Sequence, residues 1–134
     1  PMQLAKVLHG DLERRHTTGD LINISSLAAI MPAPQQGVYG IFKAAMLSLT
    51  RTLSVEMRKS HLRVFGVLPG VTDTEMASPL INGPTAERIL KNIPTHRWNT
   101  SEDIANAVMF LLKSGTNGDI VQVNGGEVSA LNSF

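Results

Sequence analysis

The chain has 134 residues, of which 43% are apolar and 17% charged, and its formal net charge is +1. These values fit one folded domain, and the scattered basic residues form no stripe that would bind nucleic acid or a membrane surface. The absence of cysteine excludes disulfides and thiolate metal sites. No run of ~18 apolar residues and no secretory leader is present, so we expect a cytoplasmic protein.

The first part of the chain predicts a helix followed by a strand. Residues 2–15 carry apolar side chains at three- and four-residue steps, which is the period of a helix with one buried face. A short apolar run at 21–25 predicts a buried strand. Residues 26–36 are expected to form a loop, because Pro32 and Pro34 exclude a regular helix.

A second helix is predicted over 38–58, with two apolar faces that suggest packing both on a sheet and on a neighbouring helix. The main stripe consists of Phe42, Met46, Leu49, Leu53 and Met57. The smaller face consists of Ile41, Ala45, Ser48 and Thr52. Residues 62–68 are largely apolar and predict a second buried strand, which the dipeptide Pro69-Gly70 ends.

The last part of the chain begins with an irregular stretch at 72–99, in which we expect one short helix at about 84–92. A better-signalled helix follows, because Thr100 can cap it and Asp103 occupies the third helical position. Residues 120–123 predict a third strand. Strands separated by helices over 40 to 50 residues favour parallel pairing, and the sequence therefore predicts an α/β fold.

Tyr39 and Lys43 are the residues that point to chemistry. Their spacing of four places both side chains on one face of the predicted helix, one turn apart. An ammonium beside a phenol favours the phenolate, so the pKa of Tyr39 is expected to fall from about 10 toward neutrality. A phenol that exchanges its proton near neutral pH can serve a carbonyl reductase or an alcohol dehydrogenase.

Each of these residues also has a plainer interpretation. A tyrosine and a lysine four residues apart are common as an exposed pair on a helix surface. Ser26, taken alone, is better explained as a loop hydroxyl than as a catalytic one, and Thr74 is explained equally well as a turn former or a cap. The four histidines are scattered without carboxylate or histidine partners at ligand spacing, so we expect no metal site.

Four segments together resemble the second half of a short-chain dehydrogenase/reductase. They are Asn23-Ile24-Ser25-Ser26, the pair Tyr39 and Lys43, Pro69-Gly70-Val71-Thr72-Asp73-Thr74, and Val123-Asn124-Gly125-Gly126. Ser26 lies thirteen residues before Tyr39, which is the usual separation in that family. The resemblance implies part of a doubly wound, Rossmann-like parallel sheet, with residues 1–134 as the C-terminal portion of a single domain.

The resemblance also implies a role for each matching residue in hydride transfer between NAD or NADP and a ketone or secondary alcohol. Tyr39 is the implied general acid and base, Lys43 lowers its pKa, and Ser26 orients the substrate oxygen. The implied cofactor-binding residues are Tyr39, Lys43, Pro69, Gly70, Val71, Thr72 and Thr74. The family's helices corresponding to 2–15 and 38–58 meet across a two-fold axis, which implies a homodimer or homotetramer.

Other features depart from the family pattern and leave alternatives open. No Gly-x-x-x-Gly-x-Gly turn for the cofactor pyrophosphate occurs in the chain. Phe42, Phe65 and Thr72 replace the residues usual in the family. The alternatives are a truncated or inactive fragment without turnover, which we expect of the 134 residues alone, or a sugar-nucleotide epimerase or dehydratase. The substrate pocket is expected near Leu27, Ala28, Pro34 and residues 76–98. These residues do not indicate which substrate binds.

Overall fold

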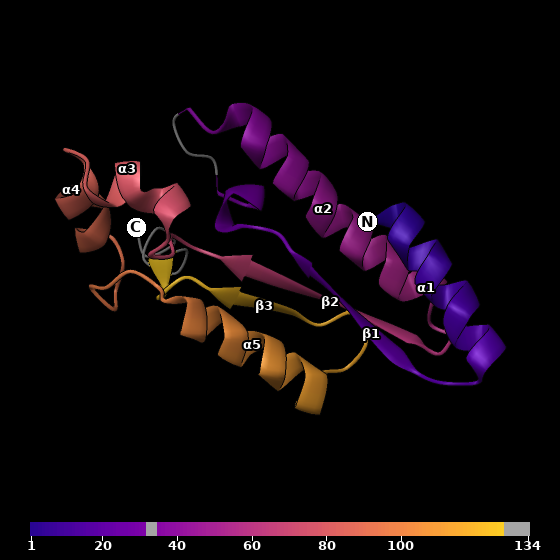
Figure 1. Ribbon diagram of the computed structural model, residues 1–134. Helices are drawn as coiled ribbons and strands as arrows, with labels where there is room; N and C mark the ends of the chain where they lie inside the picture. Colours follow the sequence, from indigo (N-terminus) through magenta and orange to yellow (C-terminus); the bar gives the residue numbers. More distant parts are fainter. Residues whose placement is uncertain (32–34, 128–134) are drawn as a thin grey trace.

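A computed structural model describes residues 1–31 and 35–127 and contains a three-stranded parallel sheet in the order β1-β2-β3 (Figure 1). The strands are β1 (Gly19–Ile24), β2 (Leu62–Pro69) and β3 (Ile120–Val123). The helices are α1 (Met2–Arg15), α2 (Gly37–Glu56), α3 (Ser78–Ile81), α4 (Ala86–Lys91) and α5 (Ser101–Ser114), with short 3₁₀ helices η1 (Leu27–Ala29) and η2 (Glu75–Ala77). The α/β class and the parallel pairing are confirmed.

The sheet is covered on both faces, which explains why β2 is apolar along nearly all its length. Helices α1 and α2 lie over one face and α5 over the other (Figure 1). On the first face Val64 packs in a cluster with residues of both helices, including Ala5 and Leu53. On the second face Phe65 and Leu111 form the centre of another cluster. Neighbouring residues of β2 thus point into two different cores, as a central parallel strand requires.

The buried line of α2 differs from the predicted stripe at its first turn. Leu53 is buried, and Leu49 and Met57 pack against the same core. Phe42, however, is 71% exposed. The line that faces the sheet runs instead through Leu47, Thr50 and Leu53, and Phe42 lies outside that arc.

The segment between β2 and α5 is more helical than predicted. The expected helix near residues 84–92 is present as α4, but η2 and α3 were missed. Pro79 lies in the first turn of α3. A missing backbone N–H has little cost there, because that group has no partner within the helix.

Two connections leave the same edge of the sheet and position the residues considered below. Ile24 is in register with Val67, and Ser25 donates its backbone N–H to the Val67 carbonyl at 2.8 Å. The chain after β1 and the chain after β2 therefore start side by side at the carboxyl edge. In open parallel sheets this edge is where ligands bind.

Candidate active site

Ser26 is the second residue after β1 and begins the 3₁₀ helix η1. Its Oγ accepts a hydrogen bond from the Ala28 backbone N–H at 3.1 Å, which caps this short helix. A hydroxyl that accepts in this way keeps its own proton for another partner. The structure therefore places the serine at the carboxyl edge of the sheet, with a donor still available.

Tyr39 and Lys43 lie together in the first turns of α2. The Lys43 Nζ is 5.5 Å from the centre of the Tyr39 ring, within the range of a cation–π contact. The same Nζ donates to the Ile24 carbonyl at 3.1 Å, at the last residue of β1. The Tyr39 side chain is exposed, and its hydroxyl makes no hydrogen bond to another described residue. The predicted proximity of the two side chains is thus confirmed, while the roles of both residues stay predictions.

The start of α2 is held against the end of β1 by two further contacts. Ser25 is buried, and its Oγ donates to the Lys43 carbonyl at 2.7 Å. A Cβ at Gly40 would lie 3.0 Å from the Ala28 carbonyl oxygen, so the helix can approach η1 this closely because residue 40 is glycine. These contacts fix α2 relative to the strand end, and they thereby fix Lys43 relative to Ser26.

The second connection, Pro69 to Thr74, is tied to β3 at its start. Gly70 donates its N–H to the Val123 carbonyl at 2.8 Å, and a Cβ at Gly70 would lie 3.0 Å from the Asn124 Cα. The Thr72 hydroxyl donates to the Gly70 carbonyl at 3.1 Å. Neither the Val71 N–H nor the Thr72 N–H donates to another described residue. Two adjacent backbone donors are therefore available at this edge.

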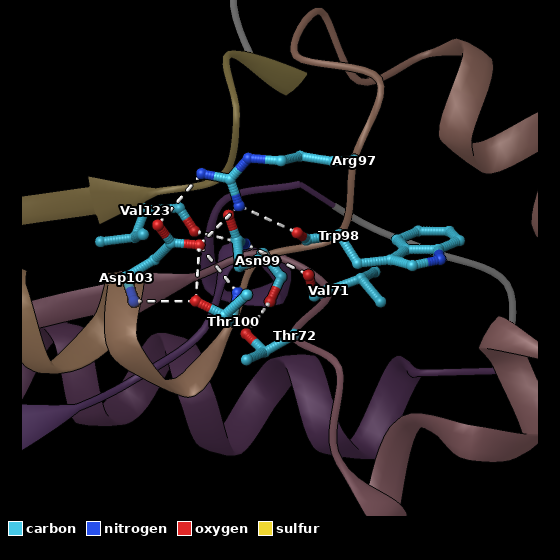
Figure 2. Close-up of polar contacts among 9 residues, drawn as sticks. Val71, Thr72, Arg97, Trp98, Asn99, Thr100, Asp103 and Val123 are labelled. Atoms are coloured by element: carbon cyan, nitrogen blue, oxygen red, sulfur yellow. Dashed lines mark hydrogen bonds and ion pairs between the residues drawn. The ribbon is translucent and has the colours of Figure 1, made fainter.

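Asn99 is the site residue that the sequence did not reveal. Its amide nitrogen donates to the Val71 carbonyl at 3.2 Å and to the Val123 carbonyl at 2.9 Å (Figure 2). Its backbone N–H also reaches the Val71 carbonyl, at 3.1 Å, and its carbonyl accepts from the Asp73 N–H at 2.8 Å. No motif marks this asparagine, so the sequence offered no signal for it.

The neighbouring residues of Asn99 form the predicted helix cap. The Thr100 hydroxyl and the Asp103 carboxylate form a capping box at the start of α5, which confirms the prediction. Arg97 binds the same carboxylate with two nitrogens, at 2.6 and 3.0 Å (Figure 2). Hydrogen bonds from Arg97 and then from the Thr100 backbone hold the pKa of Asp103 well below its usual range. The segment that carries Asn99 is thus anchored to α5.

An apolar groove of about 300 Å³ lies between η1 and the start of α2. It is lined by Ala28, Ala29, Ile30, Gly37, Gly40, Ile41 and Ala44. The lining includes Ala28, as expected for the substrate pocket, but none of Ser26, Tyr39 and Lys43. Because none of the three reactive side chains lines the groove, we do not assign it to the substrate. The predicted pocket residue Pro34 lies outside the described residues.

Residues 1–31 and 35–127 contain neither a cluster of metal-binding side chains nor a membrane-spanning helix. No three histidine or acidic side chains in these ranges lie close enough together to hold a metal ion. None of their helices is both long and apolar enough to cross a bilayer.

Nearly the whole sequence matches the model of a known protein family. Residues 2–127 match the family model described as enoyl-(acyl carrier protein) reductase. The sequence is also 35% identical to a short-chain dehydrogenase/reductase from Brucella melitensis whose structure is solved, with a TM-score of 0.74. The chain belongs to the short-chain dehydrogenase/reductase family. The match to the Brucella structure covers 81% of this chain and 45% of that one.

Other relatives of this family member are named as reductases and dehydrogenases. The chain is 34% identical to an L-xylulose reductase of Caenorhabditis elegans, over 94% of this chain and 52% of the relative. It is 37% identical to a 3-oxoacyl-(acyl-carrier-protein) reductase of Rickettsia felis, over 81% of this chain and 46% of the relative. A protein from Agrobacterium tumefaciens, named as a putative 2-deoxy-D-gluconate 3-dehydrogenase and solved with NADP, is 30% identical with a TM-score of 0.81, over 88% of this chain and 50% of that one. The chain thus spans about half the length of these proteins.

Proposed function

We propose that the chain carries the proton-transfer residues of an NAD(P)-dependent oxidoreductase that acts on CH–OH and carbonyl groups. The observation that supports this most is the joint position of Tyr39 and Lys43 at the carboxyl edge of the sheet. The phenol hydroxyl has no hydrogen bond to a described residue, and the ammonium lies 5.5 Å from its ring.

In the proposed reduction, Tyr39 gives its proton to the substrate oxygen as negative charge develops there. The Lys43 ammonium favours the phenolate that remains, because opposite charges attract. Ser26 donates its free hydroxyl proton to the same oxygen and so orients the carbonyl. In the oxidative direction Tyr39 takes the proton back. We assign these three residues the catalytic roles in the proposal.

NAD or NADP, when bound, supplies or accepts the hydride. The residues present fit the nicotinamide end of such a cofactor, since the free Val71 and Thr72 N–H groups can bind a carboxamide oxygen. We propose that Pro69 and Gly70 set the turn that presents them, that Thr74 adds a hydroxyl, and that Lys43 also binds the nicotinamide ribose. We assign no residue to binding of the cofactor pyrophosphate, because the 134 residues contain no Gly-x-x-x-Gly-x-Gly turn.

The proposal includes a small-molecule substrate and self-association. The relatives act on a sugar and on a 3-oxoacyl thioester, so these two chemical classes are the substrates to test first. We also propose a homodimer or homotetramer formed through α1 and α2. Its support is the exposure of large apolar side chains on both helices, such as Leu4, Val7, Ile41 and Phe42.

Replacement of Tyr39 by phenylalanine tests the proposed function directly. The change removes one oxygen atom that no described residue uses, so we expect the melting temperature to stay the same. We expect the reduction of L-xylulose or of a 3-oxoacyl thioester with NADH or NADPH to fall by at least about 1000-fold. The assay uses the protein at its natural length. An active Tyr39→Phe enzyme would refute the assignment of Tyr39 as the proton donor.

A further inference from the structure

We infer that Asn99 is a positioning residue that aims the Thr72 N–H toward the nicotinamide site. This inference rests on the proposed function and extends it to a residue outside the sequence motifs. Asn99 is 7% exposed, and its hydrogen bonds to other described residues are all to backbone atoms.

The peptide between Val71 and Thr72 determines where the Thr72 N–H points. No cis peptide bond occurs in the described chain, so this peptide is trans and planar. The Val71 carbonyl and the Thr72 N–H therefore point in opposite directions. Asn99 binds the Val71 carbonyl twice, through its backbone N–H at 3.1 Å and its side-chain amide at 3.2 Å. With the oxygen held toward Asn99, the Thr72 N–H must point away from it.

The side chain of Asn99 is held in place by the end of β3. Its amide donates to the Val123 carbonyl at 2.9 Å (Figure 2). That carbonyl also accepts the Gly70 N–H at 2.8 Å. Both acceptors of the Asn99 amide are carbonyls, so the NH₂ group must face them. One amide thus ties the end of β3 to the turn after β2, and the orientation of the turn is set before a ligand arrives.

A turn held in its binding conformation has a consequence for affinity. When only a fraction of molecules has the competent conformation, the apparent dissociation constant rises by the inverse of that fraction. Loss of the Asn99 amide removes its bonds to the Val71 and Val123 carbonyls. The backbone bonds of Asn99 and Gly70 remain, so the turn keeps its place but is held less firmly in the binding orientation. The effect should be confined to the nicotinamide end of the cofactor.

The test compares Asn99→Ala with wild type at its natural length. Dissociation constants are measured for NADH or NADPH, whichever wild type binds, and for the matching fragment without nicotinamide, ADP-ribose or 2′-phospho-ADP-ribose. We expect the dinucleotide to bind about tenfold more weakly, corresponding to a competent fraction near one tenth, with the fragment unchanged. Asn99→Ser, which keeps one donor, should give a smaller loss and serves if the alanine variant does not fold.

Asn117→Ala is the matched control. This asparagine also joins two elements, since it accepts from the Val64 N–H and donates to the Ser54 carbonyl, both at 2.8 Å. It lies at the opposite edge of the sheet, so its loss should lower the melting temperature without changing the ratio of the two dissociation constants. If Asn99→Ala weakens both ligands equally, or neither, the inference is wrong while the proposed function stands. If wild type binds neither dinucleotide, both fail.

Discussion

The two edges of the sheet use their polar groups in opposite ways. At the amino edge, where the strands begin, Arg63 binds the Asp20 carboxylate with two nitrogens at 2.7 and 2.9 Å. It also donates to the Leu112 and Gly115 carbonyls at the end of α5. Asn117 adds two bonds between β2 and α2. One arginine and one asparagine thus tie both strands to the helices on either face.

At the carboxyl edge several polar groups keep unused donors. Ser26 accepts a bond but retains its proton, and the N–H groups of Val71 and Thr72 donate to no described residue. The Tyr39 hydroxyl is also without a partner among them. Unused donors contribute nothing to the stability of this chain, so the comparison separates a structural edge from one arranged for a ligand. Substitutions at the two edges should therefore change different quantities.

Among the substitutions that compare the two edges, replacement of Lys43 at the carboxyl edge should have the largest effect on activity. Lys43→Ala removes the charge beside Tyr39, and we expect the rate of reduction to fall about 100-fold. Lys43→Arg keeps a cation and should lose less. The two variants are compared by kcat/KM at saturating NADH or NADPH, with the melting temperature as the control for folding. Equal and full activity in both would show that the ammonium has no part in the reaction.

Arg63 is the amino-edge counterpart, and its replacement should lower stability while leaving activity unchanged. Arg63→Ala leaves Asp20 and two helix-end carbonyls without their donor, which should lower the free energy of unfolding by about 1–2 kcal/mol after allowance for solvent screening. Activity at a temperature well below melting should stay unchanged. Urea denaturation provides the measurement.

Arg14→Ala is the matched control for Arg63. Its guanidinium pairs with Asp11 on the surface of α1 and is 78% exposed, so its loss should change stability very little. If Arg63→Ala were as mild as Arg14→Ala, the amino edge would not be the structural edge that the contacts indicate.

The local features of the carboxyl edge could be predicted from the sequence, and the long-range contacts of either edge could not. The spacing of Tyr39 and Lys43 and the Thr100 cap follow from helix geometry within one turn, so short stretches of sequence sufficed. Asn99 binds carbonyls 28 and 24 residues away, and such a contact depends on how the strands are placed in space. Phe42 was misplaced for a related reason, since the buried face of α2 depends on where the helix lies on the sheet.

Glu127 offers the smallest test of the comparison, because it places a charge at the carboxyl edge without compensation. It follows β3 by four residues, its side chain is buried, and its Oε2 has no hydrogen-bond partner among residues 1–31 and 35–127. Burial raises the pKa of this carboxyl above its ordinary value of 4.5. The folded protein therefore binds the proton more tightly than the unfolded chain does. This contribution to stability is complete below the ordinary pKa and is lost as the pH rises through the folded one.

Glu127→Gln removes this titration. We expect the variant to melt at a higher temperature than wild type near pH 7, by less than the change that Arg63→Ala produces, and the difference should vanish near about pH 4. Glu87→Gln is the control, because that side chain is 84% exposed and should show no such dependence. A gain in stability that is the same at both pH values would mean that the amide packs better, not that a buried charge was removed. The carboxyl edge would then lack the energetic cost that distinguishes it from the amino edge.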